Sequence, residues 1–511
     1  MSEKPARRRR AVAWSIIFGY SALALALARN IVLVPVYLRH IALGEYGAWL
    51  ATGGALVQLV VTDFGLAGVV TQRVAHRYGA GKSSQLGPLI GAGLLNGALL
   101  ATVLTALCLV FALFLPATQG LTAAQAHRVL QCFLLAVSAN GLAVMAGTAA
   151  GIVRSLQRAI AVGTITLVAD LASVFATVAA LLAGFGLYSL AIGMLVRSVI
   201  AAIGSLGLLA TLALREPQLR WSINWEESQA LWRDSARFFL TSIAMKLQSN
   251  ANTLFVGMLA GPQLAAVYGL TVRAHETVLM LIAQINTALG PSLAHLVGEE
   301  RHASFRALIL RLVPVMAVIA AVGMTLTVIL NETFVRLWVG AGAFGGQLTS
   351  IVMGFAMWVA SVAYVAYEAL LARGEFGRIA RTFVAASILH VLLLLVLVRL
   401  GIWGAPVAVL LTTLCWGAVL GRHVIRDAAL SPAEILSIGG EVALIAVIAV
   451  AVGAGFTFGY PKSGSWPSLV TEAAVCALVL VATLLGLLPR LRRQIREEFS
   501  LTLRAMRAAQ A

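Results

Sequence analysis

The chain has 511 residues, of which 60% are hydrophobic and only 11% charged. Soluble globular proteins carry about 25% charged residues, and here apolar runs recur along the whole chain. The composition therefore excludes most soluble enzyme folds and predicts an all-α, polytopic membrane protein. In a soluble protein the net charge of +17 would suggest a nucleic-acid partner. In a membrane protein it predicts no nucleic acid but cytoplasmic loops that face anionic lipid.

Apolar runs between polar breaks predict about fourteen transmembrane helices. The first six lie at about 11–36, 43–74, 86–115, 125–150, 159–183 and 187–214. The next six lie at about 236–260, 264–297, 307–331, 346–372, 379–400 and 404–425. The last two lie at about 437–459 and 468–489.

The basic residues predict the orientation of these helices. Most of the 37 Lys and Arg residues fall in the two termini and in the loops on the same side. The opposite loops hold only Arg39, Arg128, Arg336, Arg399 and Lys462. Positive loops are cytoplasmic, so we expect both termini inside and a location in the bacterial inner membrane. The basic head and the segment Ala26-Leu27-Ala28 also resemble a signal peptide, but an odd number of spans would break this alternation, so we expect the segment to remain as the first helix.

Weak internal similarity predicts two six-helix lobes. The same spacing separates Asn30 from Tyr46-Gly47 and Asn252 from Tyr268-Gly269. Six spans return the chain to its starting side, so the halves would be related by an axis along the membrane normal. The expected organisation is an N-lobe at 1–214, a cytoplasmic linker at 215–235, a C-lobe at 236–425, two further helices within 426–489 and a basic tail at 490–511.

The usual motifs of enzymes are missing from the sequence. Gly81-Lys82-Ser83 resembles the end of a phosphate-binding loop, but that loop needs glycine at the position of His76. Cys108, Cys132, Cys415 and Cys476 lie in apolar segments without ligand-like spacing, so we expect buried thiols and neither disulfides nor metal. We therefore expect transport without covalent chemistry, no cofactor and no catalytic residue.

Four basic residues fall within predicted helices, where an ionisable side chain usually faces a wet cavity or a partner. They are Arg29, Arg197, Lys246 and Arg273. A cluster of fixed cations at membrane depth indicates an anion site, and the planar guanidinium suits phosphate. Arg29 with Asn30 and Lys246 with Asn250 have no carboxylate in their own helices. We therefore predict a substrate site formed by these side chains together with Arg273 and Arg197.

Three acidic residues offer structural as well as functional interpretations. Glu276 lies three residues after Arg273, so the two can neutralise each other. Asp170 can pair with Arg197 as a buried bridge within one lobe, an interpretation that we favour over a substrate contact. Asp63 is either a lobe-stabilising acceptor or a proton or sodium site. All three carboxylates are candidates for ion coupling.

Short segments in both halves carry a family resemblance. The first half has PVYLR at 35–39, GEYGAW at 44–49 and DFGL at 63–66. The second half has ARFF at 236–239, Gly261, VYGL at 267–270 and LWVG at 337–340. These segments resemble oligosaccharide flippases of the multidrug/oligosaccharidyl-lipid/polysaccharide exporter superfamily.

The resemblance implies a protein that moves a polyprenyl-diphosphate-linked oligosaccharide from the cytoplasmic to the outer leaflet, by alternating access of two lobes, with a polymerase and glycosyltransferases in the same pathway. The cationic cavity of the family maps to Arg29 and Arg273, with Glu276 beside them. Many relatives have an acidic residue in the seventh helix where this chain has Asn250-Ala251-Asn252, which weakens the expectation of a carboxylate ion site there.

Two other functions stay open from the sequence. A cation-coupled multidrug exporter of the same superfamily would share the fold but would need an anionic cavity for its cationic substrates. A non-transporting membrane assembly subunit would use its buried charges as contacts between helices.

Overall fold

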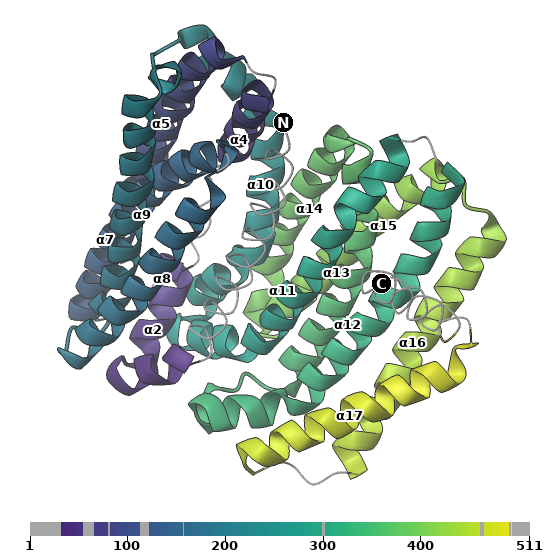
Figure 1. Ribbon diagram of the computed structural model, residues 1–511. Coiled ribbons are helices and arrows are strands. Elements are labelled where there is room, and N and C mark those ends of the chain that lie inside the picture. The colour runs from purple at the N-terminus through teal and green to yellow at the C-terminus, as the bar shows by residue number, and fades with distance from the viewer. Residues whose placement is uncertain are drawn as a thin grey trace, which may run out of the picture. The chain divides into compact units, whose positions relative to one another are not determined.

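The computed structural model describes residues 32–54, 66–79, 82–112, 122–156, 158–298, 302–459, 464–489 and 492. The chain falls into two compact units that divide between Ala266 and Val267. These ranges are built from helices and contain no strand (Figure 1), which confirms the predicted all-α fold. Ten of the described helices are long and apolar enough to cross a membrane, so the chain is a multi-pass membrane protein.

The first unit begins, within the described ranges, with a helix at 32–40. It continues with α2 (Leu43–Trp49), the π-helical turn η1 (Leu50–Gly54), α4 (Leu66–Gly79), η2 (Ser83–Gln85), α5 (Leu86–Ala112), α7 (Ala123–Ser155), α8 (Ala159–Leu182), α9 (Tyr188–Arg215), η3 (Pro217–Leu219) and α10 (Trp225–Ala260). The next helix, α11 (Pro262–Gly298), begins in this unit and continues in the second.

The start of α10 differs from the sequence prediction, which placed it at 236. Asn224 caps the helix, because its side-chain oxygen accepts a hydrogen bond from the backbone N–H of Glu227 at 3.1 Å. Glu226 and Glu227 occupy the first turn, where the helix dipole favours negative charge. Capping and charge therefore extend the helix through a polar stretch that hydrophobicity alone does not mark as helical.

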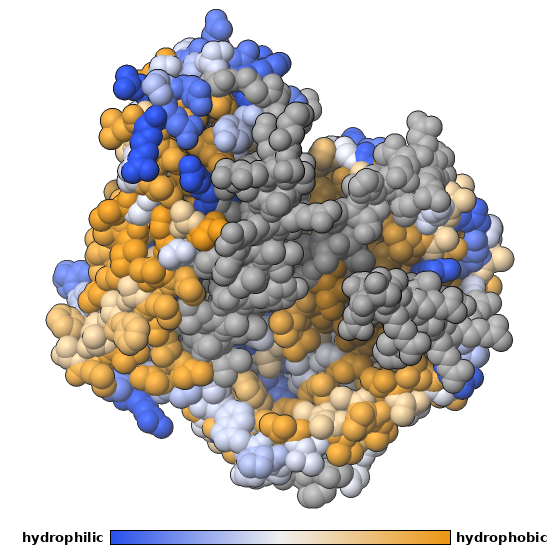
Figure 2. Space-filling model, in the orientation of Figure 1, coloured by the Kyte–Doolittle hydropathy of each residue, from blue (hydrophilic) through white to orange (hydrophobic). Residues whose placement is uncertain are grey.

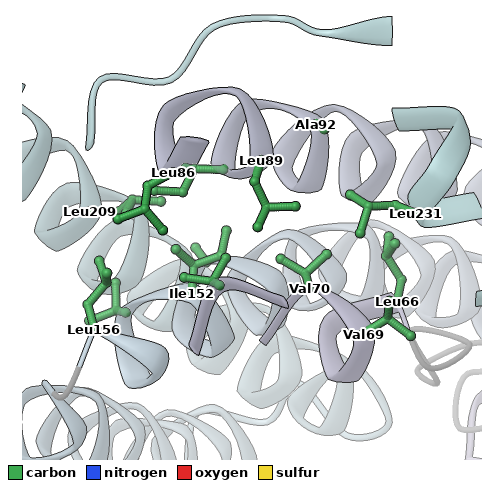
Figure 3. Close-up of a cluster of buried hydrophobic side chains, with 14 of the residues drawn as sticks. Leu66, Val69, Val70, Leu86, Leu89, Ala92, Ile152, Leu156, Leu209 and Leu231 are labelled. Atoms are coloured by element: carbon green, nitrogen blue, oxygen red, sulfur yellow. The ribbon is translucent and has the colours of Figure 1, made fainter. Parts of the chain in front are cut away.

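A cluster of buried aliphatic side chains joins the helices of the first unit at one end (Figure 3). It includes Val70 of α4, Leu86 and Leu89 of α5, Ile152 of α7 and Leu209 of α9, each at most 1% exposed. Leu231 of α10 joins the same cluster. Close packing of these side chains holds the first turns of α10 within the first unit.

Polar contacts reinforce the position of α10. The Glu227 carboxylate accepts a hydrogen bond from Arg77 of α4 at 2.7 Å. Asn96 of α5 donates to the carbonyl of Ser228 at 3.0 Å, and the Ser228 hydroxyl donates back to the Asn96 side chain. Both sides of the Asn96 amide are thus satisfied in a buried position.

Two glycines permit close helix contacts in the first unit. A Cβ at Gly193 of α9 would overlap the Thr177 hydroxyl of α8 and lie 3.1 Å from the Ser173 carbonyl. A Cβ at Gly47 of α2 would overlap the carbonyl of Pro262 at the start of α11. Each contact therefore requires a residue without a side chain.

The second unit contains the rest of α11 and, within the described ranges, six further α-helices. These are α12 (His302–Val339), α13 (Gln347–Ala372), α14 (Phe376–Leu397), α15 (Gly404–Asp427), α16 (Pro432–Gly459) and α17 (Trp466–Leu487), with short 3-10 turns η4 (Ala341–Ala343) and η5 (Val398–Leu400). Antiparallel α14 and α15 pack side by side.

The last two helices, α16 and α17, pack on α12 (Figure 1). The contact is apolar, with Ala321 of α12, Ile445 of α16 and Leu480 of α17 all fully buried. At one end Arg306 of α12 pairs with Glu434 of α16 through two hydrogen bonds, one of them 3.2 Å from Nε to Oε1. These helices are therefore an integral part of the core of the second unit.

Large apolar side chains are exposed along the helix flanks. Phe175 on α8 is 73% exposed and Ile203 on α9 is 69% exposed. In the view of Figure 2 the flank of the first unit is mainly hydrophobic, and hydrophilic residues gather towards its ends. A soluble protein rarely exposes so much apolar surface, so these flanks face lipid. Of the four cysteines, three are buried as predicted, but Cys415 on α15 is exposed.

Candidate transport site

Three of the predicted site residues, Arg29, Asn30 and Asp63, lie outside the described residues. Their convergence with the other cations therefore stays a prediction. The remaining six lie on α8 to α11 and divide between the two units.

Lys246 lies on α10 with its side chain exposed. Within the described ranges no carboxylate pairs with it, and its backbone carbonyl accepts a hydrogen bond from the Asn250 amide at 3.2 Å. One turn further on, the amide of Asn252 donates to the carbonyl of Gln248 at 3.2 Å, while its Oδ1 is buried and accepts no hydrogen bond from the described groups. The middle of α10 thus presents a cation next to polar amides.

The polar residues of α10 and α11 make these two helices less hydrophobic than the long helices that could span a membrane. Neither α10 nor α11 is among the ten helices that length and composition mark as spans. Both were predicted from the sequence as transmembrane helices. Their polar and charged side chains lower the mean hydropathy, and such helices would be stable in a bilayer only where those groups face protein or water.

Arg273 and Glu276 lie on α11 in the second unit and form the ion pair that their spacing predicted. The Arg273 Nη1 and Glu276 Oε2 atoms are 3.6 Å apart, with the two side chains 24% and 42% exposed. The Nε of Arg273 is buried and donates to no described group. The guanidinium therefore keeps a donor that the pair with Glu276 does not use.

A buried polar network sets the rotation of α11. The Asn331 amide of α12 donates to the Thr271 carbonyl at 2.8 Å and to the Ser350 hydroxyl of α13 at 2.7 Å. The Thr271 hydroxyl in turn accepts from the backbone N–H of Gly345 at 2.7 Å. Because Thr271 faces these helices, Arg273, about 200° further round α11, lies on the opposite and partly exposed side.

Arg197 and Asp170 form the predicted bridge between α9 and α8. The Arg197 Nε donates to Asp170 Oδ1, and the two side chains are 44% and 14% exposed. The interpretation as a bridge within one unit is confirmed. Arg197 therefore offers a substrate only the guanidinium nitrogens that Asp170 does not engage.

Two buried carboxylic acids were overlooked in the sequence. Glu368 on α13 is 6% exposed, and Glu472 on α17 is 5% exposed. Each is a single acidic residue in an otherwise apolar helix, which is the signal that could have identified them. Both lie in the second unit and add to the candidates for proton binding.

Comparisons with known proteins bear on this arrangement. A family model described as a polysaccharide biosynthesis protein matches residues 93–342, a little under half of the chain. No curated protein matches the sequence. A solved structure of the lipid II flippase MurJ, in an inward closed conformation, matches with a TM-score of 0.69 at 10% identity and covers 92% of this chain and 98% of that chain.

Two further solved structures share the same architecture. A multidrug resistance MATE family transporter of the MOP superfamily, in an inward-facing conformation, matches with a TM-score of 0.59 at 13% identity, over 80% of this chain and 99% of that chain. The chain has the fold of the MOP superfamily. A MOP superfamily transporter from Pyrococcus furiosus, whose binding pocket is described as reversed in polarity, matches with a TM-score of 0.54 at 15% identity, over 83% and 97% of the two chains.

The MOP fold is the fold that the short sequence segments predicted. The three matched structures are transporters rather than enzymes. Because the MOP fold includes both a flippase and multidrug transporters, the fold alone leaves the substrate open, and the charge of the site has to distinguish an anionic from a cationic substrate.

Proposed function

We propose that the protein is a flippase that moves a polyprenyl-diphosphate-linked oligosaccharide from the cytoplasmic to the periplasmic leaflet for surface polysaccharide synthesis. The match to polysaccharide biosynthesis proteins supports the pathway. A diphosphate carries negative charge that must cross a low-dielectric barrier, and fixed cations in a hydrated cleft lower that cost.

The observation that carries the proposal is Lys246. It lies in a polar stretch of α10, and its ammonium pairs with no carboxylate of the described chain. An unpaired ammonium at membrane depth is costly unless it binds an anion or faces water. Arg273, with one guanidinium nitrogen unused, and Arg29 would supply the remaining positive charge.

The test measures surface polysaccharide together with the amount of protein in the membrane. Lys246→Ala and Arg29→Ala should abolish the polysaccharide at near-normal membrane levels, because removing a cavity charge relieves desolvation. Lys246→Arg should retain part of the activity. The matched control is Lys82→Ala, in an exposed loop position, which should have no effect. Normal polysaccharide from both alanine variants would refute the cationic site.

The second candidate is a cation-coupled multidrug exporter, because MATE transporters share the fold. Its cationic substrates would be repelled by Lys246 and favoured by a negative cavity, which makes it the weaker candidate. Reconstituted vesicles separate the two functions. A flippase should move labelled lipid-linked glycan without exporting a cationic dye, and the reverse result would establish the exporter.

Ion coupling would depend on Asp63, Asp170, Glu276 or the substrate's own charge. Asp170 and Glu276 have arginine partners, so we expect their neutralisation to lower the amount of folded protein rather than to alter coupling. For Asp170→Asn, a second change of Arg197→Gln should restore protein levels, because it removes the unpaired charge. A double variant that folds but transports independently of the ion gradient would instead identify Asp170 as a coupling site.

The expected cellular setting is the bacterial inner membrane, with both termini in the cytoplasm and the pathway's polymerase and glycosyltransferases as functional partners. The 215–235 segment, with Arg215, Arg220 and Arg233, and the α4–α5 connection, with Lys82, would then lie on the cytoplasmic side. Reporter fusions at the two termini test this orientation directly.

A further inference from the structure

A groove of about 500 Å³ runs between α14 and α15 in the second unit. All of its lining residues belong to this unit, and neither Lys246 nor Arg273 is among them. Its lining changes from basic to apolar along the helix axes. At one end are Arg378 and Arg381 of α14 and His423 of α15, and towards the other end are Leu389 and Cys415.

Two basic side chains at this end of the groove have no carboxylate partner among the described residues. Arg378 is already neutralised, because it pairs with Asp427 at 2.9 Å and with Glu375 at 3.4 Å. Arg381 donates through Nε to the carbonyl of Gly377 at 3.3 Å. Neither Arg381 nor His423 pairs with a carboxylate in the part of the chain that the structure describes. Their remaining N–H groups are available to an anion at the mouth of the groove.

The surrounding charge favours the same kind of ligand. The ends of α14 and α15, together with the turn before α14, hold five arginines against two carboxylates, namely Arg373, Arg378, Arg381, Arg422 and Arg426 against Glu375 and Asp427. These residues lie in the predicted cytoplasmic loops or at the helix ends next to them. A basic cluster at this level attracts the anionic headgroups of the cytoplasmic leaflet.

The apolar part of the groove can hold the first half of an acyl chain. Trp416 forms its wall and is fixed by aromatic neighbours, with ring centroids 5.2 Å from Phe383 and 5.5 Å from Tyr364. Small residues at Ala385 and Ala386 leave the hollow open. From Arg381 to Leu389 the groove follows α14 for about 12 Å, parallel to the direction of a lipid tail.

We propose that this groove binds one anionic glycerophospholipid of the cytoplasmic leaflet, with its phosphate held by Arg381 and His423 and one acyl chain along Trp416. A free phosphate would use only the basic end, and an uncharged lipid only the apolar part. The change from a basic end to an apolar wall fits a molecule that has both an anionic headgroup and an apolar tail. The proposal is independent of the substrate that the protein transports.

The exposed Cys415 provides the readout, since it lines the groove while the other three thiols are buried. Purified protein in detergent is treated with a maleimide dye in the presence of increasing phosphatidylglycerol or phosphatidylcholine. Phosphatidylglycerol should slow labelling of Cys415 at about fivefold lower concentration, the factor that one arginine contributes near anionic lipid.

Variants of the basic residues test where the preference for phosphatidylglycerol arises. Arg381→Gln and His423→Gln should each reduce the preference for phosphatidylglycerol, and Arg381→Gln should nearly remove it. The matched control is Arg399→Gln, an exposed arginine in η5, directly after the opposite end of α14, which should leave the preference unchanged. Arg381 and Arg399 are exposed and His423 is partly exposed, so none of the three changes disturbs the core. A normal elution profile in size-exclusion chromatography confirms that each variant is folded.

Two results would overturn the proposal. Equal protection by both phospholipids, or full protection in Arg381→Gln, would show that the basic end binds no headgroup. Protection by polyprenyl diphosphate at lower concentration than by phosphatidylglycerol would assign the groove to the transported lipid instead. Loss of polysaccharide transport in Lys246→Ala bears only on the proposed function and leaves this outcome unaffected.

Discussion

The Asn331 network offers a direct test of how the second unit holds α11. Asn331 is 1% exposed and donates two hydrogen bonds, to Thr271 and to Ser350. Asn331→Leu keeps a similar volume but removes both. A hydrogen bond between membrane helices contributes about 0.6 kcal/mol on average, and about 1.5 kcal/mol in favourable cases. We therefore expect the variant to lose about 1–3 kcal/mol of stability.

The matched control lies one turn earlier on the same helix. The hydroxyl of Thr327 is buried but donates only to carbonyls of its own helix, at 2.9 Å to Gly323. Thr327→Val should therefore cost less than about 1 kcal/mol. Unfolding in mixed detergent micelles, followed by circular dichroism, gives both values. If Asn331→Leu were no more destabilising than Thr327→Val, the network would not be what holds α11 to its neighbours.

Three further predictions concern packing and movement. Gly193→Ala should destabilise the protein by about 1–3 kcal/mol in the same unfolding assay, because its Cβ overlaps α8, whereas Gly207→Ala on the open side of α9 should be neutral or slightly stabilising. Arg306→Gln should cost only about 0.5–1 kcal/mol, since its ion pair is partly exposed, but should speed protease cleavage near the start of α16; unchanged cleavage would argue against that contact. If the two predicted lobes move relative to each other during alternating access, cysteines placed at Arg39 and Gln263 and joined by a linker of roughly 10 Å should arrest transport until the linker is cleaved. Continued transport with the linker in place would refute a movement of the lobes at these positions.

The sequence was sufficient to predict the fold class and the pairs of charges. A membrane requires long apolar helices, so hydropathy alone indicated most of them. Arg273 and Glu276 are three residues apart on one helix, and only a few carboxylates could neutralise Arg197, so both pairs could be anticipated. Isolated charges in apolar helices are rare, so each has only a few possible ion-pair partners in the sequence.

Other features depended on information that hydropathy does not contain. The network around Asn331 joins residues from three helices, and its formation depends on how each helix is rotated. Asn, Ser and Thr are too common in membrane helices to indicate such a contact. The early start of α10 depends on the cap at Asn224, which lies in a polar segment without apolar periodicity. Glu368 was visible as a single acidic residue, but its burial was not.

The contact at Gly47 has a consequence for the proposed alternating access. There the backbone of α2 lies against the backbone of α11 at Pro262 and Ala266, with no room for a Cβ between them. A contact between backbones can separate without leaving a buried charge unpaired. It is also sensitive to a single methyl group, which would force the two helices apart. Gly47→Ala should therefore favour a state in which this contact is open, so that one state of the proposed transport cycle could be isolated without any ligand.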